Sequence, residues 1–199
     1  MSVKSPICLF DMDGTLFDYD GAIRRDMRKL MSPEEIEPED LYDESKPYLK
    51  ERMDLIKSIP GWWRDLPVHK LGWEVLEKVR ELNFKIKILT KGPNSKPLAW
   101  AEKVECVYNH FGKSIKPDIV GEDKSGVYGH VLVEDFPPYV LGWLKHRPRG
   151  LCIIINDKKN KDFCHDNVIR YDGKNIEEIN RHLVAVTKRK EGEHWRDYL

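Results

Sequence analysis

The sequence predicts an α/β fold, with a parallel β-sheet covered by helices on both faces and a small helical insert after the first strand. Short apolar runs suited to buried strands alternate along the 199 residues with segments of helical periodicity, a pattern typical of parallel sheets. Residues 19–65 show helical periodicity and no strand pattern. We therefore expect a core domain formed by residues 1–18 and 66–199, and a cap domain formed by residues 19–65.

The first predicted strand is the apolar run Ile7–Phe10, which leads directly into Asp11 and Asp13. Ligands of open α/β sheets bind just beyond the carboxyl ends of the strands. Continued strand geometry places these two carboxylates on one face, and Gly14 lets the backbone turn close to a ligand. Two carboxylates at a buried strand end repel each other, so they require a cation or a proton.

Mg²⁺ meets this requirement, because it prefers oxygen ligands and is commonly shared with substrate phosphate. We interpret the stretch as a magnesium-assisted phosphoryl-transfer site in which Asp11 is the attacking carboxylate. An ordinary capped turn is the alternative. A calcium loop would need further ligands at alternate positions, but Thr15, Phe17 and Tyr19 stand there, which excludes it.

Two helices are expected in the cap, over residues 21–31 and 45–59, separated by an acidic linker at 32–40. Pro60-Gly61 ends the second helix, and the aromatic pair Trp62-Trp63 follows. Because this insert directly follows the first strand, we expect it to lie over the strand ends.

Helical patterns and apolar runs alternate in the rest of the chain. We predict strands over 84–89, 116–120, 131–133, 151–155 and 168–170, and helices over 68–82, 97–111, 137–145 and 175–186. Pro137 or Pro138 suits the first turn of its helix. Residues 187–199 are predicted to form a loose helix or a docking segment.

Polar groups follow two of these later strands. Thr90 and Lys91 follow one, Glu134 and Asp135 follow another, and Lys124 lies in a loop between them. Each has an ordinary structural alternative, since a strand-end threonine often caps a turn and an isolated lysine is usually solvated. Their occurrence together with the opening carboxylates favours a site.

In this order, Asp11-Met12-Asp13-Gly14-Thr15, Thr90, Lys124 and Glu134-Asp135 resemble the four motifs of the haloacid dehalogenase (HAD) superfamily of phosphatases. The segment Pro60–Leu66, the ten-residue step from Lys124 to Glu134 and the small cap resemble the 5'(3')-deoxyribonucleotidases of cytosolic type. The resemblance implies a HAD-like (Rossmannoid) fold. It also implies a magnesium-dependent phosphatase that converts (deoxy)nucleoside monophosphates to nucleoside and phosphate through an aspartyl-phosphate.

The resemblance also assigns roles to individual residues. It implies that Asp11 is the nucleophile and that Asp13 is the acid–base catalyst. It also implies that Mg²⁺ is held by Asp11, by the backbone carbonyl of Asp13 and by Asp135, with Glu134 behind it. The implied phosphate-binding residues are Thr90, Lys91 and Lys124, and the implied base-binding residues are Tyr19, Trp62 and Trp63. Lys91 stands where the family has a small hydroxyl residue, and Glu134 stands where it has an aspartate.

Three alternatives to these roles stay open. The side chain of Asp13 is an alternative metal ligand, Glu134 and Asp135 are exchangeable in their roles, and the two tryptophans are equally suited to simple packing. Two other functions also stay open. One is a HAD phosphatase for another small phosphate ester, such as a sugar phosphate, and the other is a catalytically silent nucleotide-binding module, since a fold does not fix a function.

Composition limits the partners and the location. Basic and acidic residues number 34 each, so no strong field favours a nucleic acid polymer or a membrane surface. The chain has no apolar run of membrane-spanning length and no signal-peptide pattern. Four widely spaced cysteines are typical of free thiols in a reducing compartment. We expect a cytoplasmic protein, and a homodimer is an open option.

Overall fold

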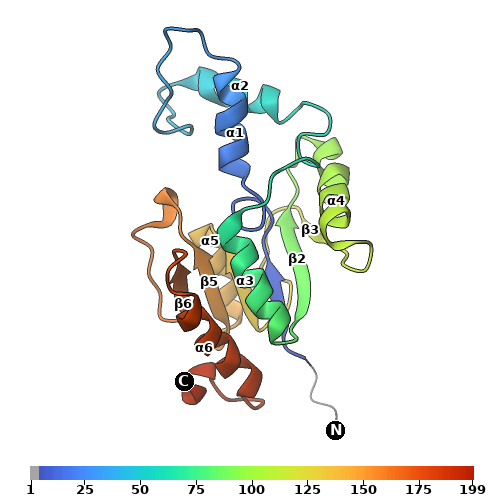
Figure 1. Cartoon of the computed structure of the whole chain (residues 1–199), viewed down its shortest axis with the longest axis vertical. Helices are drawn as coiled ribbons and strands as arrows, with labels where there is room; N and C mark the ends of the chain where they lie inside the picture. The colour runs from blue at the N-terminus through green and yellow to red at the C-terminus, as the bar shows by residue number, and fades with distance from the viewer. Residues whose placement is uncertain (1–4) are drawn as a thin grey trace.

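A computed structural model describes residues 5–199 and shows a single six-stranded sheet (Figure 1). The strands are β1 (Ile7–Phe10), β2 (Lys85–Lys91), β3 (Asp118–Val120), β4 (Val131–Glu134), β5 (Leu151–Ile155) and β6 (Val168–Tyr171). They lie in the order β3-β2-β1-β4-β5-β6, and every neighbouring pair is parallel. The predicted parallel α/β fold is confirmed.

Helices cover both faces of the sheet. The helices α3 (Lys70–Glu81), α4 (Pro97–Phe111) and α6 (Ile176–Lys188) share one apolar cluster with the larger part of the core. The helix α5 (Pro137–His146) packs on the opposite face, where Trp143 belongs to a second cluster with Leu9 and Cys152. The strands β1, β4 and β5 are nearly continuous apolar runs because both of their faces are buried.

The cap contains α1 (Tyr19–Arg28) and α2 (Pro47–Ile56), which extend beyond the carboxyl ends of the strands (Figure 1). Helix α1 begins two residues earlier than the sequence pattern predicts. Asp18 causes this, because its carboxylate caps the helix by accepting a 2.9 Å hydrogen bond from the backbone N–H of Gly21. The division into a core and a cap at residues 18 and 65 stays a prediction.

Three strands extend further than predicted, and β6 does so by one residue, Tyr171. Thr90 and Lys91 belong to β2 because they pair with Ile119 and Val120 of β3, and Glu134 is the last residue of β4. Since parallel strands have their carboxyl ends at one edge of the sheet, the polar residues that end β1, β2 and β4 come together there.

The C-terminal segment packs on the core. After α6 a short 3₁₀ helix, η2 (Trp195–Tyr198), places Trp195 with its side chain buried, 5.2 Å from the ring of His182 between centroids. This agrees with the packing expected of a docked tail. Among residues 5–199, no helix combines the length and the apolar character that a membrane span requires.

Candidate active site

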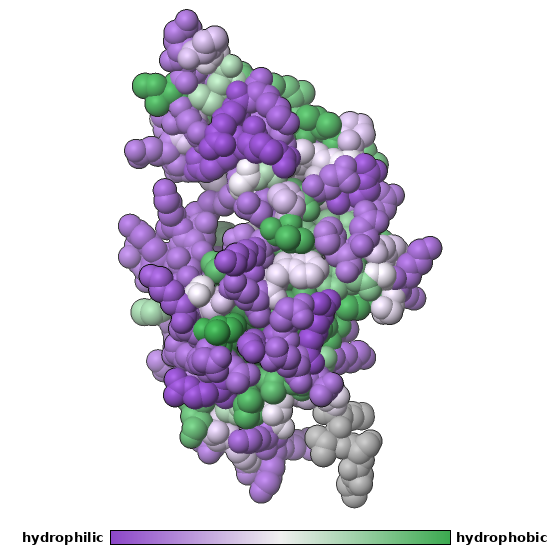
Figure 2. Space-filling model, in the orientation of Figure 1, coloured by the Kyte–Doolittle hydropathy of each residue, from purple (hydrophilic) through white to green (hydrophobic). Residues whose placement is uncertain are grey.

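A cavity of about 700 Å³ lies between the cap and the carboxyl ends of the strands. The face of the protein shown in Figure 2 is largely hydrophilic. The residues that line the cavity are Asp11, Asp13, Gly14, Tyr19, Asp20, Tyr42, Trp63, Lys91, Pro93, Asn94, Ser95, Lys124, Glu134, Asp135, Phe136, Tyr139 and Lys159. Eight of the ten residues singled out from the sequence are among them; the exceptions are Thr90 and Trp62.

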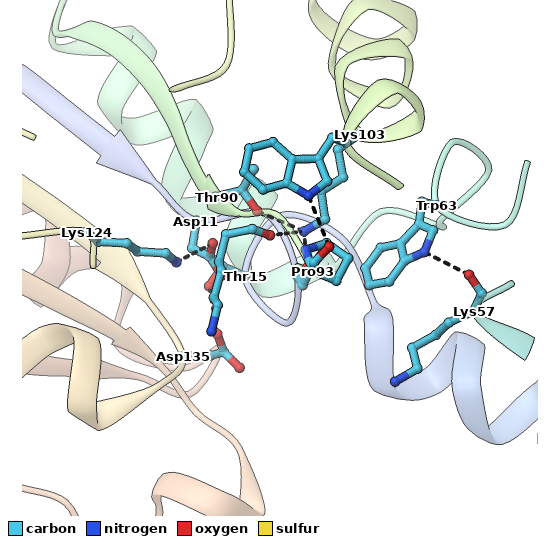
Figure 3. Close-up of polar contacts among 12 residues, drawn as sticks. Asp11, Thr15, Lys57, Trp63, Thr90, Pro93, Lys103, Lys124 and Asp135 are labelled. Carbon is cyan, nitrogen blue, oxygen red and sulfur yellow. Dashed lines mark hydrogen bonds and ion pairs between the residues drawn. The ribbon is translucent and has the colours of Figure 1, made fainter. Parts of the chain in front are cut away.

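Asp11 lies at the floor of the cavity, directly after β1, where its backbone N–H donates to the carbonyl of Val133 at 2.9 Å. The buried Lys124 ammonium donates to Asp11 Oδ1 at 2.5 Å (Figure 3). It also donates to Glu134 Oε2 at 2.8 Å. Burial alone lowers the pKa of Lys124, but the attraction of these two carboxylates outweighs it and raises the pKa. Lys124 therefore stays charged next to Asp11.

A third carboxylate, that of Asp135, joins this group. Carboxylate oxygens of Asp11, Glu134 and Asp135 all lie within 4.8 Å of one another. Burial, followed by repulsion from Glu134 and Asp11, raises the pKa of Asp135 well above its ordinary value. Gly14 makes the approach possible, because its φ is +78° and a Cβ there would lie 2.3 Å from Asp135 Oδ2.

The charges of this site suit a divalent cation. Among residues 5–199, ion pairs join three of its four carboxylates, those of Asp11, Asp13 and Glu134, to the buried ammonium groups of Lys103 and Lys124, and Asp135 makes none. The crowding of these carboxylates favours a bound cation or protonation. The donors are all hard oxygens, which Mg²⁺ prefers, so these residues fit a magnesium site.

Asp13 is turned away from the three-carboxylate cluster toward Lys103 of α4, a residue that the sequence analysis missed. The Lys103 ammonium pairs with Asp13 Oδ2 and donates to Thr90 Oγ1 at 3.0 Å and to the backbone carbonyl of Lys91 at 2.9 Å (Figure 3). Burial raises the pKa of Asp13, and Lys103 opposes the rise. Asp13 Oδ1 is buried and has no partner among residues 5–199.

Lys103 did leave a signal in the sequence. It is four residues after Ala99 and three before Cys106, and all three lie on the buried stripe of α4. A lysine at a stripe position is buried, so it needs an anionic partner. The sequence alone does not identify that partner, because Asp13 is 90 residues away.

The predicted phosphate-binding residues lie at different depths. Lys91 lines the cavity, as does Lys124. Thr90 has no exposed surface, and its hydroxyl accepts the hydrogen bond from Lys103. In this structure Thr90 contacts Lys103, and its phosphate-binding role stays a prediction.

Among the predicted base-binding residues, Tyr19 and Trp63 line the cavity, with ring centroids 5.6 Å apart. The indole N–H of Trp63 donates to the carbonyl of Lys57 at 3.1 Å (Figure 3). Trp62 is turned the other way. Its indole N–H donates to Asp26 Oδ2 at 2.9 Å, and it lines a separate cavity of about 470 Å³.

Asp26 stabilises this arrangement of the cap. Its pKa is held well below the usual range, chiefly by the hydrogen bonds from Arg25 and also by those from Lys29 and Trp62. The ionised carboxylate therefore stabilises the fold above the unfolded-state pKa of about 3.9, and this contribution is lost as pH falls through the lower folded-state pKa.

Asp26→Asn is expected to lower the free energy of unfolding by about 1–2 kcal/mol at pH 7, a modest loss because Arg25 and Lys29 are exposed. The difference from the unchanged protein should shrink below about pH 4. Urea denaturation of both proteins at pH 7, 5 and 3 measures it. A difference that grows at low pH would contradict the role of Asp26.

The chain is similar to several known proteins. The family model described as "5' nucleotidase, deoxy (Pyrimidine), cytosolic type C protein" matches residues 5–189. A Bacillus subtilis protein described as a HAD-hydrolase, YfnB, solved with bound magnesium, has a similar structure. It has a TM-score of 0.54 and 12% identity over 91% of this chain and 99% of that one. A haloacid dehalogenase-like hydrolase from Burkholderia xenovorans has a TM-score of 0.49 and 14% identity, over 84% of this chain and 92% of that one. No curated protein matches the sequence significantly.

Proposed function

The chain belongs to the 5' nucleotidase, deoxy (pyrimidine), cytosolic type C family, and from this premise we propose that it is a magnesium-dependent phosphatase of (deoxy)nucleoside monophosphates. The observation that carries the proposal is the pairing of Asp11 and Asp13 with two different buried lysines at one end of an aromatic-walled cavity. The proposal includes a cytoplasmic location, as in the description of the family.

In the proposed reaction, a carboxylate oxygen of Asp11 attacks the phosphorus, and the bond from phosphorus to the ester oxygen breaks. Asp13 donates a proton to the departing oxygen of the nucleoside. Asp13 then accepts a proton from a water molecule, which attacks the aspartyl-phosphate and releases phosphate and free Asp11. Such proton transfer typically contributes about 10²–10⁴-fold.

The surrounding residues position these groups. Lys124 balances the charge of Asp11, and Lys103 fixes the direction of the Asp13 carboxylate. Magnesium, held by Asp11 and Asp135 with Glu134 adjacent, would offset the negative charge of the phosphate. Lys91 and Lys124 face the cavity and would contact the phosphate oxygens.

The cap would bind the nucleoside part of the substrate. Tyr19 and Trp63 line the cavity with aromatic rings, and a base stacked on such a ring gains roughly 1–3 kcal/mol. Asn94 and Ser95 line the same cavity and supply polar groups. This combination favours a nucleotide over a sugar phosphate.

A substrate panel tests the proposal. Phosphate release would be measured with deoxy- and ribonucleoside monophosphates, sugar phosphates and an aryl phosphate, each with Mg²⁺ and with EDTA. We expect magnesium-dependent release that is fastest from nucleotides. Release from sugar phosphates alone would replace the nucleotide proposal, and no release from any compound would favour a silent binding module.

Trp63→Ala is expected to raise KM for nucleotides roughly 5- to 150-fold, because a base would lose its stacking partner. KM for ribose 5-phosphate, which has no base, should change much less. Trp62→Ala is the matched control, since Trp62 faces the other cavity. It should lower the thermal midpoint and leave the preference between the two substrates unchanged. If both variants changed the preference for nucleotides over ribose 5-phosphate equally, Trp63 would have no specific role in stacking on the base.

A further inference from the structure

The cap contacts the core along two edges of the cavity that differ in strength. On the α4 edge, the buried Glu102 carboxylate accepts backbone N–H bonds from Gly61 at 2.6 Å and from Trp63 at 3.2 Å. Lys96 adds a 2.6 Å hydrogen bond to the hydroxyl of Ser58. Breaking this edge would leave a charged carboxylate buried without partners, which is costly, so this edge is fixed.

On the opposite edge a partly exposed cluster joins the cap to the core. Lys159, from the 3₁₀ turn η1 (Lys158–Asn160), pairs with the carboxylate of Asp20 in the first turn of α1. The hydroxyl of Tyr42 donates to Asp20 Oδ1 at 3.1 Å, and the Lys159 ammonium lies 4.4 Å from the centre of the Tyr42 ring. The side chains of Lys159 and Asp20 are 46% and 27% exposed, and exposed pairs are weak. This edge therefore opens at low cost.

The turn that carries Lys159 is itself tied to the catalytic end of the sheet. Asn160 is fully buried, and its amide donates at 2.8 Å to the backbone carbonyls of Asp135 and Ile155. The Asp157 carboxylate accepts from the N–H of Lys159 at 2.8 Å. In Figure 1 this orange turn rises toward the cap on the side away from α4. The position of Lys159 is thus set by the strand that delivers Asp135.

We propose that Lys159 and Asp20 are specificity-determining positioning residues. Their ion pair holds the cap wall that contains Tyr19 and Tyr42 against the core, so that the cavity closes around the nucleoside part of a substrate. A phosphate ester that does not reach this wall gains nothing from the contact. The inference rests on the proposed function for its substrate class, while the contact itself is independent of it.

Substrate preference gives the first test. Lys159→Ala is expected to raise KM for nucleoside monophosphates about two- to fivefold relative to KM for ribose 5-phosphate, the range that corresponds to one exposed ion pair. Lys159→Arg should restore the preference, since a guanidinium also pairs with a carboxylate and stacks on a tyrosine. Lys158→Ala is the matched control, because Lys158 lies in the same turn and makes no ion pair among residues 5–199.

Amide hydrogen exchange of the substrate-free protein gives the second test. Residues 38–46, which contain Tyr42, should exchange severalfold faster in Lys159→Ala and in Asp20→Asn, and at the original rate in Lys158→Ala. Unchanged exchange in both Lys159→Ala and Asp20→Asn would overturn the inference even if nucleotides are hydrolysed. If no nucleotide is hydrolysed, the proposed function fails, while the exchange result still decides whether this pair closes the cap.

Discussion

Asp11→Asn is expected to abolish phosphate release, with a loss of kcat on the order of 10⁴–10⁶-fold, the size typical of removing a covalent nucleophile. An asparagine amide has nearly the same shape as the carboxylate, but its oxygen is a poor nucleophile. Lys124 would keep its second partner, Glu134, so the chain should remain folded. Initial rates and circular dichroism, measured on the same preparations, separate lost chemistry from lost structure.

Asp123→Asn provides the matched control. Asp123 precedes Lys124 in the chain, and within residues 5–199 its carboxylate accepts hydrogen bonds from the backbone N–H and the hydroxyl of Ser125 alone, in an exposed turn. This variant should retain most of the activity.

Acid quenching of the unchanged protein during turnover should trap a phosphoryl group on the peptide that contains Asp11. Activity above a few per cent in Asp11→Asn, or a trapped group elsewhere, would remove Asp11 from the proposed role.

Removal of divalent cations is the change expected to have the second-largest effect. Exhaustive chelation should stop turnover, and added Mg²⁺ should restore it, because the carboxylates of Asp11, Glu134 and Asp135 crowd together at a buried strand end. Asp135→Asn removes one of these charges. The dissociation constant of the Asp135→Asn variant for Mg²⁺, measured by titration calorimetry without substrate, should be at least about tenfold higher than that of the unchanged protein.

The control for Asp135 is Asp166→Asn, which removes an exposed carboxylate in the loop before β6. It should bind Mg²⁺ like the unchanged protein. Full activity after chelation would exclude the metal from the reaction. Unchanged affinity in Asp135→Asn would instead place the ion on other ligands.

The positions of β1, β4 and β5 could be predicted from the sequence because burial on both faces produces apolar runs that end abruptly at polar residues. The strand β2 was recognised from its alternation of apolar and polar residues, and β3 and β6 were only short candidates. The parallel arrangement of the strands was enough to predict that Asp11, Lys91 and Asp135 lie close together, and all three line the same cavity. The strand ends were less well predicted. Thr90 and Lys91 extend β2 because β3 lies beside them, and this pairing has no local signal.

The parts of the site that were missed depend on contacts across long stretches of chain. Lys103 reaches Asp13 across 90 residues, and Asn160 reaches Asp135 across 25. The two adjacent tryptophans illustrate a different limit. They look alike in sequence, but the turn after Gly61, whose φ is +85°, sends their side chains to different cavities.

The central place of β1 in the sheet has a consequence for how the protein matures during synthesis. Its neighbours β2 and β4 come from far along the chain, with Cys8 opposite both Ile86 and Val131. A nascent chain that ends before β4 has one side of β1 unpaired, and Asp11 lacks Glu134 and Asp135, the other two carboxylates of its cluster. Such late, non-local pairing slows folding. Catalytic competence is therefore acquired only when the ribosome has completed well over half of the polypeptide.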